Sequence, residues 1–294
     1  GANVAELLDV GALANVEEGK TIRAEATIKV KRRSLALAVA ASRHRDEERT
    51  YLLVECQNVS RIRELEAMID SYSKMVERSQ RELRREKERA ERLLLNIMPR
   101  SVYEEMKTFG VAAPRLYDDA SVIMLDFIDF TEMPIADDPT AVIAELNDIF
   151  TAFDRIVEQF GCERIKTMGD AYVAVAGIPE PTPEHKIDIA RVALGFRRYI
   201  QERNTTRAQK WHCRIGVASG PLIGSIVGVQ KYVYDIFGPT PNLAARLESL
   251  CDPMEICITA DLAEELRADF IVEPKATVEL KGFGQVRVCR LVSG

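Results

Sequence analysis

The fold is decided by a short stretch of sequence, residues 121–127, which reads SVIMLDF. An apolar run of this length predicts a buried β-strand. Outward from it, the apolar spacing predicts two helices and three further strands: helices over 140–160 and 184–204, and strands over 163–168, 171–176 and 213–219. The order β-α-β-β-α-β is that of a ferredoxin-like α+β domain. Many functions use this fold, so the function has to be argued from the site.

Bulk composition limits the classes of function. The 294 residues are 47% hydrophobic and 29% charged, with a formal net charge of −6, as in a globular protein. The acidic balance argues against nucleic acid as a partner. No apolar stretch reaches the length of a membrane-spanning helix, so we expect no membrane segment in this chain. The chain begins with Gly1, and a longer parent protein could be attached to a membrane upstream.

The six cysteines are scattered along the chain and lack the spacing of a metal site. Most of them lie in apolar, strand-like runs. We therefore expect reduced core residues of a cytoplasmic protein.

Residues 20–60 are expected to form three strands, over 22–31, 34–42 and 51–59, with the charged stretch 43–49 as a hairpin loop. This part resembles the last half of a PAS sensor domain, and Asn58-Val59-Ser60 stands where such domains close with an Asp-Ile-Thr-like signature. The alternative is a small antiparallel sheet of no particular family.

The pattern changes its period from residue 62 onward. The a positions of a heptad repeat are Ile62, Ile69, Val76, Leu83, Ala90 and Ile97, and the d positions are Leu65, Tyr72, Ser79, Glu86 and Leu93. This register predicts a parallel coiled coil of modest stability, since two d positions are polar. The alternative is a single solvated amphipathic helix. Pro99 should end the helix at or near Met98.

Two acidic residues are expected to meet at one edge of the sheet. Asp126 ends the first strand, and Asp170 lies at the tip of the hairpin 163–176, which neighbours that strand in a ferredoxin-like sheet. A carboxylate at the end of an apolar strand needs compensation for its desolvation. Two facing carboxylates repel, and a pair of hard divalent cations removes the repulsion. Taken alone, Gly169-Asp170 is also ordinary turn chemistry.

A third motif follows at residues 234–248, which read YDIFGPTPNLAARLE. Thr240 is expected as a helix N-cap, with Pro241 in the first turn. Asn242 and Arg246 are then four residues apart on one helix face. A helix N-terminus, an amide and a guanidinium together suit a phosphorus centre with growing negative charge.

Together with residues 126–131 (DFIDFT), 166–172 (KTMGDAY) and 278–282 (VELKG), these motifs closely resemble the class III adenylyl and guanylyl cyclases. The resemblance implies a ferredoxin-like class III cyclase domain that uses two divalent metal ions, Mg²⁺ or Mn²⁺. It implies Asp126, Asp170 and the Phe127 carbonyl as metal ligands, and amides after Asp126, at Phe130 and Thr131, as the phosphate cradle.

The resemblance also assigns roles in substrate binding and catalysis. It implies that Asn242 orients the nucleotide, that Arg246 stabilises the transition state and that Lys281 binds the terminal phosphates. Base choice falls to Lys166 and Asp235, with Ile236 beside them. Lysine only donates hydrogen bonds and an ionised aspartate only accepts them, which matches N1 and N6 of adenine and mismatches guanine. ATP is therefore the expected substrate.

Class III cyclases form their active sites between two catalytic domains. The resemblance implies that Asp126 and Asp170 come from one subunit, and that Lys166, Asp235, Asn242, Arg246 and Lys281 come from the other. This chain carries both sets, so a symmetric homodimer would hold two equivalent sites. Two departures from the family pattern stand out: Asp129 replaces a usual glycine, and residues 219–221 lack an arginine that some members use on phosphate.

We therefore expect four segments: a partial PAS-like sensor domain over 1–60, a coiled-coil signalling helix over 61–98, a linker or transducer segment over 99–118, and a nucleotide cyclase catalytic domain over 119–294. The expected function is that of an adenylate cyclase regulated by the N-terminal region. The alternatives are a guanylate cyclase and a catalytically silent cyclase-like module. Diguanylate synthesis is disfavoured because its Gly-Gly-Asp/Glu-Glu-Phe signature is absent.

Overall fold

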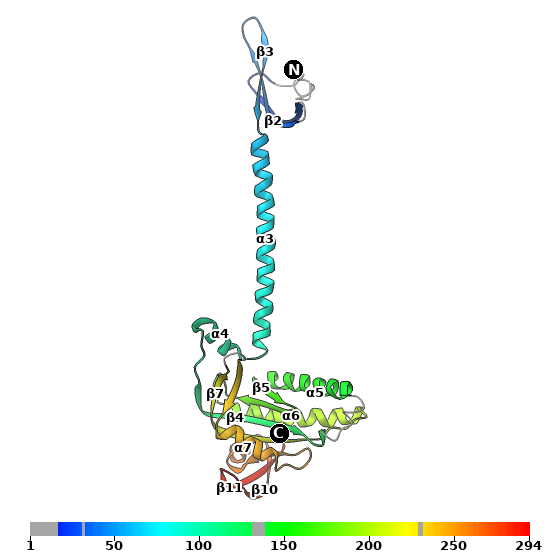
Figure 1. The fold of residues 1–294 in the computed structure, drawn as a ribbon, viewed down its shortest axis with the longest axis vertical. Helices are drawn as coiled ribbons and strands as arrows, with labels where there is room; N and C mark the ends of the chain where they lie inside the picture. Colours follow the sequence, from blue (N-terminus) through cyan, green and yellow to red (C-terminus); the bar gives the residue numbers. More distant parts are fainter. Residues whose placement is uncertain (1–16, 31–32, 131–138, 229–231) are drawn as a thin grey trace. The chain divides into compact units, whose positions relative to one another are not determined.

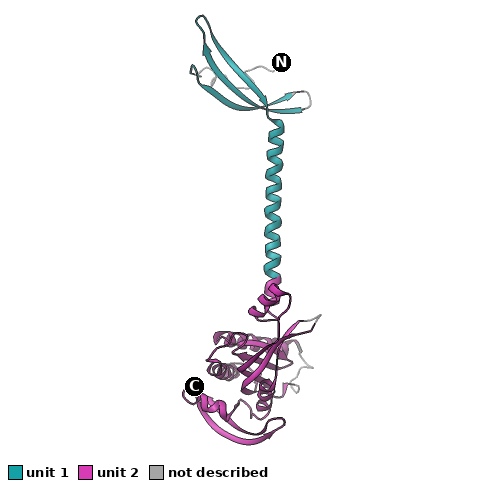
Figure 2. Cartoon of the chain, turned by 90° about the vertical axis from the view of Figure 1, so that its left-hand side faces the viewer, with its two compact units in different colours: residues 1–89 teal, residues 90–294 magenta. Residues whose placement is uncertain are grey.

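The computed structural model describes residues 17–30, 33–130, 139–228 and 232–294. The chain divides into two compact units, residues 1–89 and residues 90–294 (Figure 2). No helix among the described residues is long and apolar enough to cross a lipid bilayer.

The first unit contains a three-stranded antiparallel sheet in the order β1-β2-β3. Its strands are β1 (Thr21–Val30), β2 (Arg33–Arg45) and β3 (Thr50–Asn58). The charged stretch does form the hairpin turn, where the Asp46 amide donates to the Arg49 carbonyl. Within the described residues only Val39 and Ala41 of this sheet are fully buried. The sheet as such is confirmed, and its relation to PAS domains stays a prediction.

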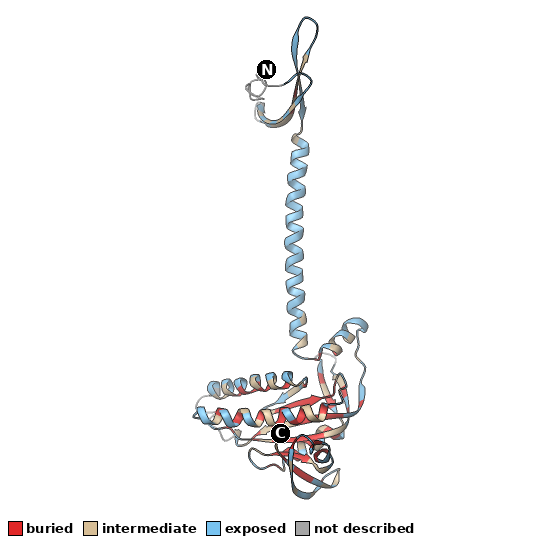
Figure 3. Cartoon of the chain, turned by 180° about the vertical axis from the view of Figure 1, so that it is seen from behind, coloured by how far each residue is buried: buried red, intermediate tan, exposed pale blue. Residues whose placement is uncertain are grey.

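Helix α3 (Ser60–Leu95) follows and has no buried residue, as the pale blue of Figure 3 shows. Within the part of the chain that the structure describes, none of the a and d side chains on this helix is therefore buried. The helix ends at Leu95, three residues before the expected Met98. Hydrogen-bonded turns continue to Met98, whose amide donates to the Leu94 carbonyl, and Pro99 then prevents further helix.

The segment 99–118 is more ordered than a linker. It contains α4 (Arg100–Phe109), which ends at Gly110 in the left-handed conformation, φ +75°. Met98 and Val102 are buried in the same core cluster as Tyr234 and Ile236 of strand β8 (Val233–Phe237). The start of this unit therefore packs against the strand that carries Asp235.

The second unit has the predicted βαββαβ order (Figure 1). Its elements are β4 (Arg115–Phe127), α5 (Pro139–Gln159), β5 (Glu163–Met168), β6 (Ala171–Ala176), α6 (His185–Thr206) and β7 (Cys213–Val227). The strands lie in the order β7-β4-β6-β5 and all four are antiparallel. This is the ferredoxin-like arrangement.

The sheet continues beyond β7. The further elements are β8, α7 (Pro239–Glu248), β9 (Ile256–Thr259), α8 (Ala260–Leu266), β10 (Ile271–Leu280) and β11 (Gly284–Ser293). Strand β9 pairs with β7 in parallel, β11 and β10 follow, and β8 pairs with the far end of β7.

Alternate residues of β4 enter two different cores, because successive side chains of a strand point to opposite faces. Ile123 and Leu125 join the core beneath α5 and α6, where the Phe153 and Phe196 rings stack at 4.0 Å. Val122 lies in the other core, with Leu247 of α7. Asp126 is four residues after Val122, so both side chains lie on the same face of β4, the face that α7 covers.

Helix α7 approaches β7 very closely at Gly216. A Cβ on Gly216 would lie 2.1 Å from the Ala244 carbonyl oxygen and 2.3 Å from the Glu248 amide nitrogen. Only glycine permits this approach, which fixes the height of α7 above the sheet.

Candidate active site

Asp126 and Asp170 converge at one end of the β4–β6 pair. Leu125 is opposite Tyr172 in the register, so Asp126, the next residue of β4, lies beside the tip of the β5–β6 hairpin that carries Asp170. Burial raises the pKa of Asp170, and the negative charge of Asp126 raises it further. The two carboxylates are thus close enough to repel each other. The predicted convergence of the two acids is present in the structure.

This donor set fits hard divalent cations. Both acids are half-buried carboxylates at the end of a sheet, and oxygen ligands are what Mg²⁺ prefers. Their mutual repulsion is the kind of strain that a bound cation relieves. The ring of Phe127 itself is buried against Trp211 at 4.8 Å, so any contribution of this residue to a metal must come from its backbone carbonyl.

The chain turns sharply after β4. Asp129 has φ +58°, in the left-handed region, at the position where the family usually has glycine. Asp129 therefore occupies a conformation that favours glycine and that aspartate is one of the few other residues to tolerate. Phe130 packs against Trp211 with ring centroids 6.0 Å apart, and Thr131 lies outside the described residues.

Lys166 and Asp235 form an ion pair. Lys166 Nζ of β5 lies 2.6 Å from Asp235 Oδ2 of β8. The other oxygen, Oδ1, accepts from the amide of Ile236 at 2.9 Å, which fixes the carboxylate plane. Tyr234 and Ile236 point into the core, so Asp235 points to the opposite face of β8. The structure thus joins one donor and one acceptor in a half-buried place.

A hollow of about 750 Å³ opens beside this pair. Lys166 and Thr167 line it, together with residues 232–234 before and on β8 and with residues 95–99 at the end of α3. The segment that follows the long helix is therefore part of the wall beside Lys166.

Asn242, Arg246 and Lys281 line a second hollow, of about 540 Å³. The first two side chains come from α7, and Lys281 comes from the turn between β10 and β11. None of the three side chains has a hydrogen-bond or ion-pair partner among the described residues. Two free cations and an amide that face one hollow are suited to a polyanion. Neither Asp126 nor Asp170 lines this hollow.

The expected N-cap role of Thr240 is wrong. Helix α7 begins at Pro239, and Gly238 is its N-cap with φ +124°. The Thr240 side chain is buried and donates to the Pro221 carbonyl at 2.7 Å, so it ties the helix to β7 instead of capping it. Pro239 explains the difference, because its ring imposes a helical φ one residue earlier than expected.

Sequence reasoning missed Arg214 and assigned no role to Glu248. Arg214 of β7 lies opposite Asp126 of β4, and its Nη2 donates to Asp126 Oδ2 at 3.1 Å. Its Nε lies 2.8 Å from Oε1 of Glu248, the last residue of α7, in an ion pair without good hydrogen-bond alignment. The available signal was an arginine inside the otherwise buried strand 213–218.

Two other groups of residues resemble ligand sites. One is a cysteine–glutamate cluster in the core, and the other is a hollow between α5 and α6. Donor atoms of Cys251, Glu255 and Cys257 lie within 4.8 Å of one another. However, Glu255 is already paired with Lys275, and burial raises the pKa of the Cys251 thiol, which donates to the Ile215 carbonyl. These residues are therefore core packing, in line with the five buried, unpaired cysteines of the structure.

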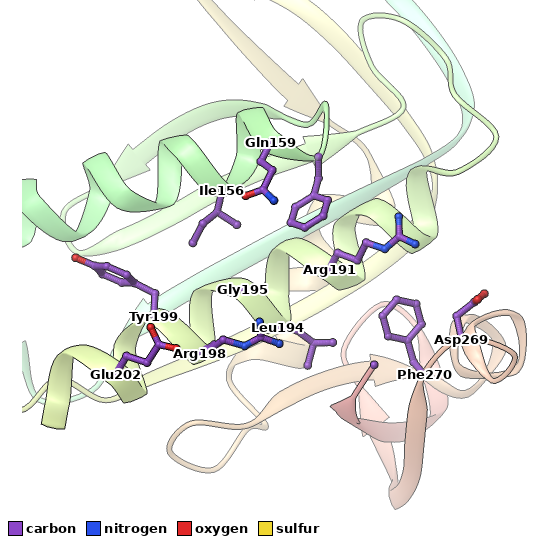
Figure 4. A pocket seen from close by; sticks show the side chains of 12 residues that line it. Ile156, Gln159, Arg191, Leu194, Gly195, Arg198, Tyr199, Glu202, Asp269 and Phe270 are labelled. Carbon is purple, nitrogen blue, oxygen red and sulfur yellow. The ribbon is translucent and has the colours of Figure 1, made fainter.

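A further hollow of about 540 Å³ lies between α5, α6 and the last residues of the chain (Figure 4). It is lined by apolar side chains such as Ile156 and Phe270 and by two arginines of α6, Arg191 and Arg198. None of the metal, base or phosphate residues predicted above lines it, so it is not part of the candidate active site.

Comparison with known proteins identifies the family of the second unit. The family model described as the Adenylate and Guanylate cyclase catalytic domain matches residues 112–292. The chain therefore belongs to this family.

Relatives named as a cyclase and as a receptor are both similar to the chain. An adenylate cyclase of Mycobacterium tuberculosis (strain ATCC 25618 / H37Rv) is 33% identical over 209 residues, covering 70% of this chain and 47% of the relative. Human atrial natriuretic peptide receptor 2 is 32% identical over 229 residues, covering 76% of this chain and 22% of the receptor. The chain thus spans half or less of the length of these curated relatives.

Among solved structures, the catalytic core of a rhodopsin-guanylyl cyclase with converted specificity, in complex with ATPαS, is 27% identical with a TM-score of 0.58. The match covers 62% of this chain and 100% of that one. A bacterial light-regulated adenylyl cyclase is 21% identical with a TM-score of 0.60, covering 71% and 63%, which supports the fold alone.

Proposed function

We propose that this chain is an adenylate cyclase that converts ATP into 3′,5′-cyclic AMP and pyrophosphate. The ion pair of Lys166 with Asp235 carries the choice of base. One donor beside one acceptor complements N1 and the 6-amino group of adenine, whereas guanine presents the reverse pattern. The mycobacterial relative named adenylate cyclase, at 33% identity, supports the same choice.

The reaction is an in-line displacement at the α-phosphorus. The ribose 3′-oxygen forms a bond to phosphorus and loses its proton to solvent, while the bond to the pyrophosphate oxygen breaks and pyrophosphate leaves. Asp126, Asp170 and the Phe127 carbonyl would hold two divalent ions, Mg²⁺ or Mn²⁺, as members of this family generally use such ions. When bound, they supply charge neutralisation and a more acidic 3′-hydroxyl.

The protein's own part is positioning and charge stabilisation, as in phosphoryl transfer generally. Lys166, Asp235 and the Ile236 backbone would hold the base. Asn242 would orient the ribose, and the amides at Phe130 and Thr131 would receive the phosphates. Two cations share the hollow with Asn242. Arg246 would stabilise the negative charge that develops on the α-phosphorane, and Lys281 would bind the terminal phosphates.

We propose a homodimer in which two chains share each active site. The hollow with Asn242, Arg246 and Lys281 contains neither acid of the metal pair, so a second chain can supply the acids. Exposed apolar side chains also flank Asp235: Val233 and Phe237 on β8 and Ile223 on β7. Such side chains are commonly covered in an assembly.

We further propose that α3 pairs with its copy as a parallel coiled coil and that the segment 1–60 is a partial PAS-like sensor. The a-position side chains Ile69 and Leu83 are 68% and 72% exposed in the single chain, so pairing would bury them. The segment 99–118 would pass the signal to the catalytic domain 119–294. A substrate made inside cells and the unpaired cysteines support a cytoplasmic location.

The decisive experiment mixes two inactive proteins, Asp126→Ala and Asn242→Ala. In a shared-site dimer, each mixed pair regains one working site, made from the intact acids of one chain and the intact amide of the other. Cyclic AMP should therefore appear with ATP and Mn²⁺ after mixing. Mixed dimers that form and remain inactive would refute the shared site.

A parallel assay of ATP and GTP decides between the competing functions. A relative named guanylyl cyclase C, from Cavia porcellus and 32% identical over 230 residues, keeps a guanylate cyclase as the second candidate. Faster turnover of GTP than of ATP would favour it. A folded dimer that turns over neither nucleotide would favour a silent binding module.

A further inference from the structure

The side chain of Arg214 lies between two functional groups that come from different parts of the fold. Arg214 and Asp126 are opposite each other on the neighbouring strands β7 and β4. One end of the guanidinium, Nη2, donates to Asp126 Oδ2 at 3.1 Å, and Nε lies 2.8 Å from Glu248 Oε1. A single planar cation therefore bridges a metal-ligand candidate and helix α7.

The helix end of this bridge is buried and fixed. The Glu248 side chain is 9% exposed, and its backbone amide lies over Gly216, two residues along β7 from Arg214. Glu248 is also two residues after Arg246 on the same short helix. A displacement of the Arg214 guanidinium would thus act on the element that carries Asn242 and Arg246.

The bridge also suits arginine and not lysine. A guanidinium presents several N–H groups in a rigid plane and can serve two carboxylates at once, whereas an ammonium is a point charge on a flexible stem. Removing the cation would leave Glu248 as a buried carboxylate without its ion-pair partner, which is costly.

We propose that Arg214 is a positioning residue that couples the two active sites of the dimer. This inference rests on the proposed shared site. In that dimer the acids of a chain serve one site, and the α7 helix of the same chain serves the other. The Asp126–Arg214–Glu248 bridge then links the metal-binding half of one site to the transition-state half of the second.

Mixed dimers can separate the two ends of the bridge. One chain carries Asp170→Ala, which removes its metal half and leaves the bridge intact; the other carries Asn242→Ala. The one working site then uses the α7 helix of the first chain and the acids of the second. Adding Arg214→Gln to the first chain perturbs only a helix that serves this site.

We expect that addition to lower kcat about 10- to 100-fold, because Asn242 and Arg246 on the displaced α7 helix would no longer be held in place for the reaction. Glu248→Gln in the same chain should have a similar effect, and the two together should be no worse than either alone. Arg290→Gln, at an arginine of β11 that also pairs with two acids, is the matched control and should leave kcat unchanged.

Each other result is informative. If Arg214→Gln lowers activity only in the chain that supplies the acids, Arg214 serves Asp126 alone and the coupling is refuted. If the parent mixture without Arg214→Gln is inactive, the shared site fails, and the proposed function fails with it. Arg214→Lys keeps the charge and guards against misfolding, and it should show the same loss.

A second readout needs no turnover. Mn²⁺ added without nucleotide should change the hydrogen exchange of α7 amides, residues 239–248, in the wild-type dimer. In Glu248→Gln this response should disappear, while the response of the β5–β6 hairpin, residues 163–176, remains. An α7 response that is equal in Glu248→Gln and wild type, or absent from both, would overturn the proposal.

Discussion

Lys166 Nζ and Asp235 Oδ2 lie 2.6 Å apart, although 69 residues separate them in the sequence. The pair is brought together because strands β5 and β8 contact each other, and both contribute residues to the wall of one hollow. Their contact, together with the hydrogen bond from the Ile236 amide to Asp235 Oδ1, fixes the orientation of both side chains. In the function proposed above, this pair would select the nucleotide base.

The first prediction concerns this pair. Lys166→Glu combined with Asp235→Cys should lower kcat/KM for ATP by at least about 100-fold and raise it for GTP, because the new side chains match guanine. Initial rates with both nucleotides measure the change. Lys166→Met is the control and should lose ATP turnover without a gain for GTP. Unchanged preference in the double variant would contradict the assignment of the base site.

The second prediction concerns Arg246, which has no partner within its hollow in the described structure. Arg246→Ala should lower kcat about 100- to 1000-fold with little change in KM, because the lost charge acts on the transition state. Steady-state kinetics with ATP provide the test. Arg287→Ala, at an exposed arginine of β11, should behave as wild type. A change confined to KM would place Arg246 in ground-state binding.

The third prediction concerns the close approach at Gly216. Gly216→Ala should cost about 1–3 kcal/mol of unfolding free energy, since its Cβ would overlap the backbone of α7. Urea denaturation measures this cost. Gly195→Ala is the comparison: its Cβ would lie 2.9 Å from Cγ2 of Ile156, a side chain that has to shift slightly, whereas no backbone atom blocks it, and alanine favours the α6 helix. Equal effects of the two substitutions would show that the approach of α7 is not tightly constrained.

The fourth prediction concerns pH. Burial lowers the pKa of His185, whose ring bonds Ser121 at 2.8 Å, with Asp119, Lys186, Asp188 and Glu265 around it. Below the unfolded pKa the unfolded state binds more protons than the native state does, so stability should fall as the pH drops from 7 to about 5.

His185→Gln should flatten this pH dependence relative to wild type. Denaturation midpoints at the two pH values measure the difference, and His212→Gln, at an exposed histidine, is the control. Acidic groups with raised pKa, such as Glu163, contribute equally to all three proteins and cancel in the comparison. A slope identical to that of wild type would assign the acid sensitivity elsewhere.

The fifth prediction concerns the long helix. One residue inserted near Ser79 rotates the following part of α3 by about 100° and breaks the heptad register. In the full chain, cyclic AMP formation or its control should change. An insertion of seven residues at the same place restores the register and should restore the behaviour. Equal activity of wild type and both insertions would argue against coupling through a coiled coil.

Local sequence patterns were sufficient for much of the fold. The apolar run before Asp126 and the spacing of the next two helices predicted the βαββαβ order, because periodicity records which face of an element is buried. Boundaries were less predictable. Strand β4 begins at Arg115 instead of Ser121, and α4 fills part of the expected linker, since contacts with β7 and the α7-side core stabilise them.

In the candidate site, too, some features were predictable from the sequence and others depended on tertiary contacts. Convergence of Asp126 with Asp170 followed from strand order alone, because adjacent strands bring their ends together. The side-chain roles proposed for these residues remain predictions. Thr240 was misjudged because a buried carbonyl of Pro221, distant in sequence, competes for its hydroxyl.

For this protein, the sequence by itself determined the order of the elements, the two acids at a sheet end and the choice of Lys166 and Asp235 as a donor and an acceptor. These depend on periodicity and on the chemistry of single residues. Only the tertiary structure decided that Arg214 bridges Asp126 and Glu248, and that α7 rests on Gly216. Such contacts join residues far apart in the chain, and their geometry exists only once the sheet and helix have packed.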